Sequence, residues 1–368
     1  MQKSKSYKPD WVPANGGNEF TSSVKKGVVP TNNSKARKFN KDFPELEEYI
    51  TGVLRNNRTL LAKTITLIES NSPKHQQIAK EIIQKLLPHA GNSVRIGISG
   101  VPGAGKSTFI ESLGIYLINN GYKVAVLTVD PSSSLSKGSI LGDKTRMENL
   151  SKEPNCFIRP SPSGNTLGGV TAKTRETITV CEAAGFDVVL IETVGVGQNE
   201  IAVRSMVDLF LLMMIPGAGD ELQGIKRGVI EISDIIVINK AEGENKIKAE
   251  RAKIEYSNAL HYMQSATAGW QTPVKLCSAI NNTGITEIWQ TVSDFINITK
   301  KNGEFNKRRQ NQVLQWFNSL IEERLKTEFY NNNNIKTFLP ILKNELLNND
   351  IFVINAVDKL FAKYKNKL

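Results

Sequence analysis

The chain has 368 residues, of which 40% are apolar and 23% charged, a composition typical of a globular protein with a sizeable core. Its formal charge is +11, and residues 1–40 contain eight basic residues against two acidic ones. Since no apolar run reaches the length of a membrane helix, these values argue against membrane, collagenous, coiled-coil and wholly disordered proteins.

The distribution of charge and the positions of the cysteines indicate which partners and which cellular location to expect. Because the basic excess lies mostly in a polar tail and no nucleic-acid-binding module is recognisable, we expect no nucleic-acid partner. Cys156, Cys181 and Cys277 are far apart, which argues against a disulfide framework or a zinc cluster. The N-terminus lacks the apolar region of a secretory signal, so the cytoplasm is the expected location, with no membrane partner.

Hydrophobic periodicity divides the chain into four predicted regions. Residues 1–41, rich in Asn, Ser, Pro and Lys, are predicted to be a poorly ordered basic extension. From Leu46 to Ile68 apolar residues recur at helical spacing, and Ser72-Pro73 is typical of the start of a second helix. Residues 42–91 are therefore predicted to form about two helices.

Residues 92–300 alternate between strand-like and helical patterns. Helical stretches are predicted at 107–119, 173–184, 221–232 and 245–263, and nearly continuous apolar runs at 94–99, 123–129, 187–191, 209–215, 235–239 and 274–277. Apolar strands separated by helices are typical of a parallel sheet covered on both faces. The prediction is a doubly wound, mostly parallel α/β domain.

Residues 301–368 are predicted to be a helical arm. After a polar joint at 300–306, one apolar stripe at helical spacing runs from Val313 to Leu325, and further helical stretches follow at 338–347 and 351–364. Such large apolar residues have to pack on their own domain or on a second subunit.

A phosphate-binding loop directly follows the first predicted strand. The motif G-x-x-x-x-G-K-[ST] is met by Gly100, Val101, Pro102, Gly103, Ala104, Gly105, Lys106 and Ser107, with Thr108 continuing into a helix. Its backbone N–H groups and the helix N-terminus are suited to bind phosphates, Lys106 to neutralise the β- and γ-phosphates, and the Ser107 hydroxyl to bind Mg²⁺.

The residues that follow the predicted strand at 235–239 indicate which nucleotide base is bound. Asn239, Lys240, Ala241 and Glu242 resemble the guanine-reading N-K-x-D signature, in which Asn contacts the base edge, Lys lies over the ring and the acid accepts from guanine N1–H and N2. Glu242 is one methylene longer than the usual acid. A small-residue loop behind the base is predicted at Ser278, Ala279 and Ile280. The pattern favours GTP over ATP.

Further acids fall at strand ends, where open α/β sheets bind their ligands. Glu192 ends an apolar strand and is predicted to hold Mg²⁺ directly or through water, and Gly195 to offer its N–H to the γ-phosphate. Asp130, also at a strand end, is predicted to bind a metal-linked water or to orient the attacking water.

Six segments in order resemble the methylmalonyl-CoA mutase-associated GTPase family (MeaB or ArgK) of the signal-recognition-particle/nitrogenase-like P-loop class. They are 100–107, 130–133, 141–147, 192–198, 216–226 and 239–240. The resemblance covers about residues 42–330, and the stretches from Gly142 and Pro216 are more specific than the P-loop.

The resemblance implies a G-protein chaperone for an adenosylcobalamin-dependent acyl-CoA mutase such as methylmalonyl-CoA mutase. Such a protein gates loading of the cofactor, protects or reactivates the enzyme, and is a homodimer joined through its C-terminal helices. Asp130, Asp143 and Glu192 then match acids around Mg²⁺, and Asp220, Glu221, Gln223 and Lys226 match a switch facing the mutase, with Lys226 moving toward the nucleotide. No cobalamin site is identified in the chain itself.

Mg²⁺-dependent GTP hydrolysis is the predicted reaction, slow alone and faster when the partner orders the switches. Two alternatives stay open. One is a GTPase that delivers nickel to a metalloenzyme, although the histidines and cysteines show no ligand pairing typical of metal sites. The other is an ATP-using kinase linked to amino-acid transport, against which Asn239-Lys240 argues.

Overall fold

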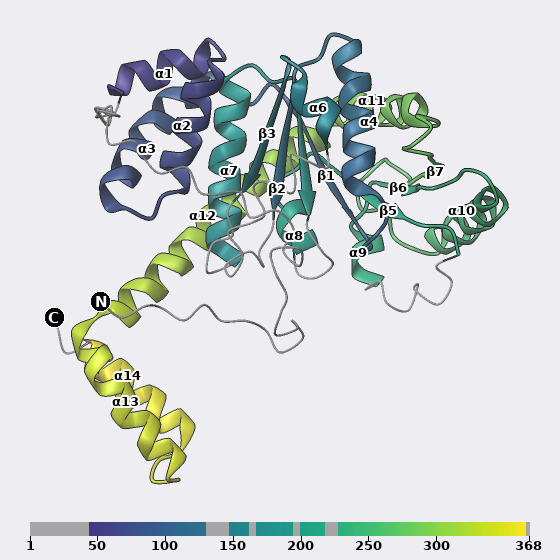
Figure 1. Cartoon of the computed structure of the whole chain (residues 1–368). Coiled ribbons are helices and arrows are strands. Elements are labelled where there is room, and N and C mark those ends of the chain that lie inside the picture. The colour runs from purple at the N-terminus through teal and green to yellow at the C-terminus, as the bar shows by residue number, and fades with distance from the viewer. Residues whose placement is uncertain (1–43, 130–146, 162–166, 194–198, 218–226, 366–368) are drawn as a thin grey trace, which may run out of the picture. The chain divides into compact units, whose positions relative to one another are not determined.

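The computed structural model describes residues 44–129, 147–161, 167–193, 199–217 and 227–365 (Figure 1). Seven parallel strands form one sheet in the order β3-β2-β4-β1-β5-β6-β7, which confirms the predicted α/β class. The strands are β1 (Val94–Gly100), β2 (Val124–Val129), β3 (Cys156–Ser161), β4 (Val188–Thr193), β5 (Leu209–Met214), β6 (Ile235–Ile238) and β7 (Val274–Leu276).

Helices cover both faces of this sheet. Strands β2, β4, β5 and β6 are buried along their whole length, as expected for a doubly covered parallel sheet. Right-handed crossovers place α4 (Lys106–Asn119) on one face and α7 (Leu167–Ala183) with α8 (Asn199–Arg204) on the other. The domain also contains α6 (Glu148–Lys152), α9 (Arg227–Glu231), α10 (Asn245–His261) and α11 (Ile285–Lys301).

Strand β3 was not predicted from the sequence. It lies at the edge of the sheet and pairs with β2 alone, with Leu127 opposite Arg159 and Thr128 opposite Pro160. A proline and an arginine interrupt the apolar run that marks the other strands. An edge strand tolerates both, because its outer side needs no ladder hydrogen bond.

The N-terminal region forms three helices, where two were expected. They are α1 (Leu46–Leu54), α2 (Arg58–Glu69) and α3 (Pro73–Leu86), followed by the 3-10 turn η2 (Leu87–His89). The predicted first helix is broken at Asn56, which has a φ of 54°, and at Asn57, whose side chain accepts from the backbone N–H groups of Thr59 and Leu60. All three helices contact α7, so this layer covers the outside of one sheet face.

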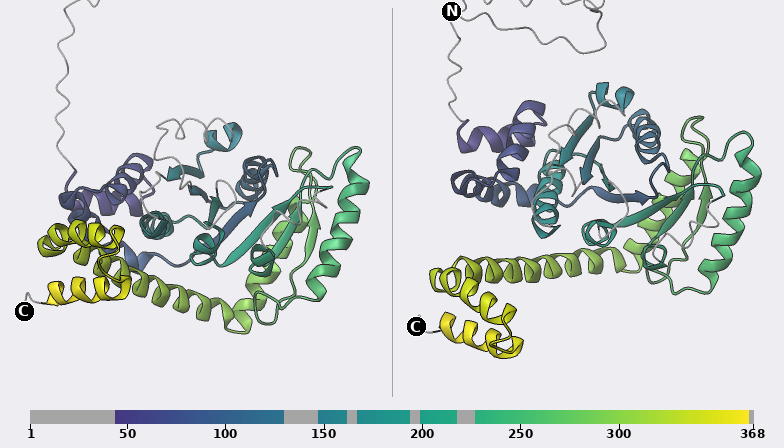
Figure 2. Two further views of the ribbon diagram at one scale, coloured as in Figure 1. Left: turned by 90° about the horizontal axis from the view of Figure 1, so that it is seen from below. Right: turned by 60° about the horizontal axis from the view of Figure 1, so that its bottom comes forward.

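The C-terminal region forms the predicted three helices, α12 (Glu304–Asn331), α13 (Asn333–Leu347) and α14 (Val353–Lys365). The expected polar joint is shorter than 300–306, because Lys300 and Lys301 belong to α11 and Gly303, with a φ of 84°, turns the chain into α12. Figure 2 shows α13 and α14 side by side at the end of α12. In the described part of the chain no helix is long and apolar enough to span a bilayer.

Of the helix predicted at 221–232, the structure describes α9; residues 221–226 lie outside the described part of the chain.

A buried cluster of ions joins α12 to the sheet at the start of β5 and β6. Asp208 accepts from the Arg95 backbone N–H at 2.8 Å and receives two bonds of 2.7 Å from the Arg309 guanidinium. Asp234 accepts from the Phe210 N–H at 2.9 Å and pairs with Arg204 and Arg308. The carboxylates of both aspartates are fully buried, so their charges depend on these partners.

Replacing Arg309 is therefore expected to destabilise the fold strongly. The Arg309→Ala variant would leave the Asp208 carboxylate buried without its cation, a loss of about 3–5 kcal/mol in the free energy of unfolding. Lys307→Ala is the control, since it removes a cation of the same helix whose pair with Glu304 is exposed to solvent, and should cost about 0–1 kcal/mol. Denaturant unfolding measures both, and equal losses would contradict the role given to Arg309.

Candidate functional site

The phosphate-binding loop joins the central strand β1 to α4. Gly100 passes so close to β5 that an added Cβ would lie 2.3 Å from the Met213 carbonyl oxygen. Gly105 has a φ of 82° and immediately precedes α4. The N–H groups of the first turn of α4, from Lys106 onward, thus face the loop at the positive end of the helix.

Lys106 lies against its own loop. Its ammonium donates to the carbonyl oxygens of Gly100 at 2.9 Å and Val101 at 3.3 Å. Val101 and Ala104 are buried, whereas Pro102, Gly103 and Thr108 are exposed. The loop is therefore anchored by two small apolar residues while its tip and the outer side of the first helical turn face solvent.

Ser107 and Glu192 meet next to this loop. The Ser107 hydroxyl donates to Glu192 Oε1 at 3.0 Å, and Glu192 is only 5% exposed at the end of β4. Because β4 pairs with β1, the sheet itself brings the carboxylate beside the loop. One hydroxyl and one carboxylate oxygen are the hard ligands that Mg²⁺ prefers, so this pair fits the predicted metal.

The end of β6 is tied to both neighbouring loops by the side-chain amide of Asn239. Its Nδ2 donates to the Ala104 carbonyl oxygen at 2.8 Å, and its Oδ1 accepts from the Ala279 N–H at 3.0 Å. The side chain is buried. Asn239 thus links the phosphate-binding loop to the loop after β7, and its predicted contact with a base edge stays a prediction.

Glu242 presents a buried acceptor close to this junction. Its Oε2 is buried and accepts no hydrogen bond from the described residues. Burial and then the negative charge of Glu242 raise the pKa of the Cys277 thiol to about 12, so the carboxylate lies near the end of β7. Lys240, between Asn239 and Glu242, takes a left-handed φ of 61°. A buried carboxylate oxygen without a donor is suited to bind N–H groups of a ligand.

The loop after β7 contains the three residues predicted behind the base. Ser278 is buried and its hydroxyl accepts from the Asn281 N–H at 3.2 Å, while Ile280 is 72% exposed. The carbonyl oxygen of Ala279 accepts from the Ser112 hydroxyl at 2.6 Å. Ser112 was not singled out in the sequence, because a polar residue inside a helix carries no local signal of a long-range bond.

A second unpredicted contact joins β1 and β4 where they end. The Thr193 hydroxyl donates to Ser99 Oγ at 2.9 Å, and both residues are buried. The structure thus brings together the predicted residues of the P-loop, β4, β6 and β7. The remaining predicted residues lie outside the described part of the chain: Asp130, Asp143, Gly195, Asp220, Glu221, Gln223 and Lys226.

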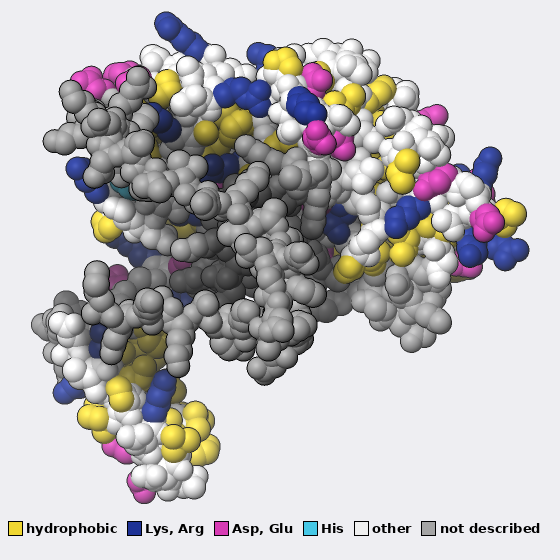
Figure 3. Space-filling view, viewed as in Figure 1, with side chains coloured by type: hydrophobic (Ala, Val, Ile, Leu, Met, Phe, Trp, Pro, Cys, Tyr) yellow, Lys and Arg dark blue, Asp and Glu magenta, His cyan; other side chains and the backbone are white. Residues whose placement is uncertain are grey.

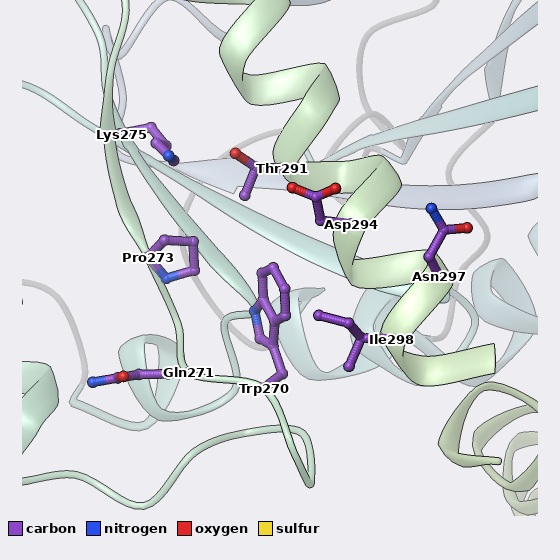
Figure 4. Close-up of a pocket in the computed structure, with 8 residues that line it drawn as sticks. All are labelled: Trp270, Gln271, Pro273, Lys275, Thr291, Asp294, Asn297 and Ile298. Carbon is purple, nitrogen blue, oxygen red and sulfur yellow. The ribbon is translucent and has the colours of Figure 1, made fainter. Parts of the chain in front are cut away.

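A separate pocket of about 390 Å³ lies between β7 and α11 (Figure 4). The Trp270 indole points into it beside Asp294 and Ile298. Trp270 precedes β7 and therefore lies at the opposite end of that strand from Ser278. Its indole Nε1–H donates to the Asp234 backbone carbonyl oxygen at 2.8 Å. This pocket contains none of the residues predicted to bind a nucleotide.

The Asn239 link can be tested with two glycine variants. Gly105→Ala would place a Cβ 2.7 Å from Asn239 Nδ2 and break the buried amide contacts, whereas Gly121→Ala, at a similar φ of 85°, meets nothing within 4 Å. Both should lose about 1–2 kcal/mol to left-handed strain, and Gly105→Ala about 1–3 kcal/mol more. Denaturant unfolding without nucleotide measures the difference; equal losses would mean that Asn239 moves aside freely.

Comparisons with known proteins identify the family of the chain. The family model described as "Methylmalonyl Co-A mutase-associated GTPase MeaB" matches residues 61–334. A putative GTPase of Caulobacter vibrioides is 47% identical over 323 residues, 88% of this chain and 98% of that protein. The GTPase ArgK of Escherichia coli is 44% identical over 306 residues, 82% of this chain and 92% of ArgK.

The same relationship holds in three dimensions. A solved structure titled "LAO/AO transport system kinase" superposes with a TM-score of 0.70 at 36% identity, covering 87% of this chain and 97% of the other. The family match spans most of the chain and includes the P-loop, Glu192 and Asn239. The chain therefore belongs to the MeaB/ArgK family of methylmalonyl-CoA mutase-associated GTPases and is a P-loop GTPase.

Proposed function

We propose that the protein is a GTP-hydrolysing chaperone of an adenosylcobalamin-dependent acyl-CoA mutase, in the first place methylmalonyl-CoA mutase. Its nucleotide state gates loading of the cofactor and protects or reactivates the mutase. Family membership supports the choice of partner. The observation that carries the nucleotide chemistry is the contact of Ser107 with the buried Glu192 directly beside the phosphate-binding loop.

The phosphates bind at backbone N–H groups of residues 100–108, except at Pro102, which has none, and the Lys106 ammonium offsets the charge that develops during phosphoryl transfer. Ser107 and Glu192 hold Mg²⁺, together with Asp130 and Asp143. When bound, Mg²⁺ supplies positive charge at the β- and γ-phosphate oxygens. Gly195 offers its N–H to the γ-phosphate.

Guanine is recognised at the ends of β6 and β7. The Glu242 carboxylate accepts from guanine N1–H and N2, Asn239 lies at the base edge, and Lys240 lies over the ring. Ser278, Ala279 and Ile280 pack behind the base. The buried Oε2 of Glu242, which has no donor among the described residues, supports this role, since an acceptor held away from water needs a donor. Switch residues Asp220, Glu221, Gln223 and Lys226 relay the nucleotide state to the mutase.

The C-terminal helices join two copies of the chain. On α12, an apolar stripe is exposed along one side of the helix: Val313, Phe317, Leu320, Ile321 and Leu325. Figure 3 shows further apolar side chains on the surface of the C-terminal region. Ile341 of α13, Val357 of α14 and Phe352 in the connection between these helices are exposed. Exposed apolar surface of this extent is typical of an interface, and a second copy covers it.

The base specificity can be tested at Glu242. Glu242→Gln keeps the size of the side chain but replaces the negative acceptor with an amide, which can donate to the O2 of xanthine. GDP should bind about tenfold or more weakly, as expected for the loss of a charged hydrogen bond, and XDP should bind better. Glu244→Gln, an exposed acid two residues away, is the control. Unchanged GDP affinity in Glu242→Gln would rule Glu242 out as the guanine acceptor.

The chaperone proposal is tested by GTP hydrolysis with and without methylmalonyl-CoA mutase from the same source, with ATP as the control nucleotide. The mutase should raise the rate by about tenfold, equivalent to about 1.4 kcal/mol of transition-state stabilisation. GTP turnover without stimulation would point to another client. ATP used as well as GTP would contradict guanine recognition and favour the kinase alternative.

A further inference from the structure

Helix α8 lies between the carboxyl end of β4, where Glu192 is located, and the base of the C-terminal arm. Five residues, 194–198, separate Thr193 at the end of β4 from Asn199 at the start of α8. The helix lies against β1, where an added Cβ on Gly97 would come within 2.8 Å of Val203. The end of α8 leads into β5 through residues 205–208, beside the base of α12.

Gln312 of α12 holds this end of α8. Its side-chain Nε2 donates to the Val207 carbonyl oxygen at 2.8 Å and to the Arg204 carbonyl oxygen at 3.4 Å. Gln312 is 5% exposed, unlike almost all the residues that follow it on α12. Among the residues that the structure describes, this contact is therefore the last buried hydrogen bond along α12 that joins it to the sheet domain.

Arg175 of α7 completes the junction. Its guanidinium donates to the Ser205 hydroxyl at 2.8 Å and to the backbone carbonyl oxygen of Gln312 at 3.2 Å. It also lies 5.6 Å from the ring centre of Trp316, one turn further along α12. Three helices, α7, α8 and α12, thus meet around one arginine and one glutamine.

This junction leaves several buried polar atoms unpaired. Arg175 Nε, Gln312 Oε1 and Trp316 Nε1 are buried, and none has a hydrogen-bond partner among the described residues. Unpaired buried donors and acceptors are costly. The junction thus holds two donors, Arg175 Nε and Trp316 Nε1, and one acceptor, Gln312 Oε1, that lack partners among the described residues, so a rearrangement of α12 against α7 that paired Arg175 with Gln312 would be favourable.

The base of α12 is fixed more firmly. One turn before Gln312, Arg308 and Arg309 contact Asp208 and Asp234 at the start of β5 and β6. These carboxylates also hold backbone N–H groups of the sheet. Arg204, the last residue of α8, also pairs with Asp234, so the end of α8 shares this anchor, and Gln312 is the contact between α8 and α12 that lies beyond it.

We propose that the Gln312–Arg175 junction is a two-state coupling through which α8 transmits nucleotide state to the orientation of the C-terminal arm. Gln312 is the positioning residue: it touches no nucleotide and acts through α8. The proposal rests on the proposed function insofar as GTP and GDP must both bind. Coupling is reciprocal, so a change at the junction has to alter the relative affinity for the two nucleotides.

The first test is the ratio of dissociation constants for a non-hydrolysable GTP analogue and GDP, measured on the full chain. Gln312→Ala should change this ratio by about fivefold, a readout that a purely structural role would not move. Gln315→Ala, an exposed glutamine on the same helix, should leave it unchanged. An unchanged ratio in Gln312→Ala, with both affinities measurable, would overturn the coupling, whereas failure of the wild-type chain to bind GTP would overturn the proposed function instead.

Trp316 supplies a second test that does not depend on whether Gln312→Ala folds. Replacing GDP with the GTP analogue should change tryptophan emission in the wild-type chain, because the Arg175–Trp316 contact changes. The Trp316→Phe variant should lose that change. If the wild-type emission is the same in both states, or if Trp316→Phe responds like the wild type, the proposal is wrong.

Discussion

The buried carboxylates of Asp208 and Asp234 constrain much of this structure. Each binds a backbone N–H at the start of a strand and at least one arginine of α12. Two full charges in the interior are unfavourable unless they are paired and hydrogen-bonded. The sheet and α12 therefore depend on each other, since β1, β5, the end of α8 and the first turns of α12 supply the partners of these two aspartates.

At the carboxyl ends of the strands, hydrogen bonds between neutral groups also join separate segments of the chain. The Asn239 amide connects the loops after β1 and β7, and the Ser112 hydroxyl connects α4 to the same loop after β7. Phosphate-binding and base-binding segments are thus held in register by short, directional bonds. A ligand spanning both segments meets a surface whose two halves are already positioned, which reduces the ordering entropy of binding.

The sequence predicted most of the sheet because its central strands are continuous apolar runs between helical patterns. It missed β3, whose Arg159 and Pro160 are acceptable only at an edge, and the break at Asn56–Asn57, where two asparagines terminate an otherwise regular helical period. Local patterns contain no information on which strands become edges.

Some residues of the candidate site could be predicted from the sequence, and others could not. Gly105, Lys106 and Ser107 could be predicted as phosphate-binding residues because a phosphate group requires this spacing. Ser112, Arg175 and Gln312 each make a hydrogen bond to a residue more than 100 positions away in the sequence. No local sequence pattern indicates such contacts. Sequence spacing predicts what one segment does with a ligand; it cannot predict how segments hold one another.

The length of α12 gives the Gln312 contact a mechanical consequence. The helix extends from its anchor at Arg309 to Asn331, about 33 Å at 1.5 Å per residue, while Gln312 lies only about 4.5 Å beyond the anchor. A rigid rod pivoting at Arg309 multiplies displacement by the ratio of these lengths. A movement of about 1 Å at Gln312 becomes about 7 Å at the far end, so α12 is a lever that converts a side-chain rearrangement into a displacement of whole helices.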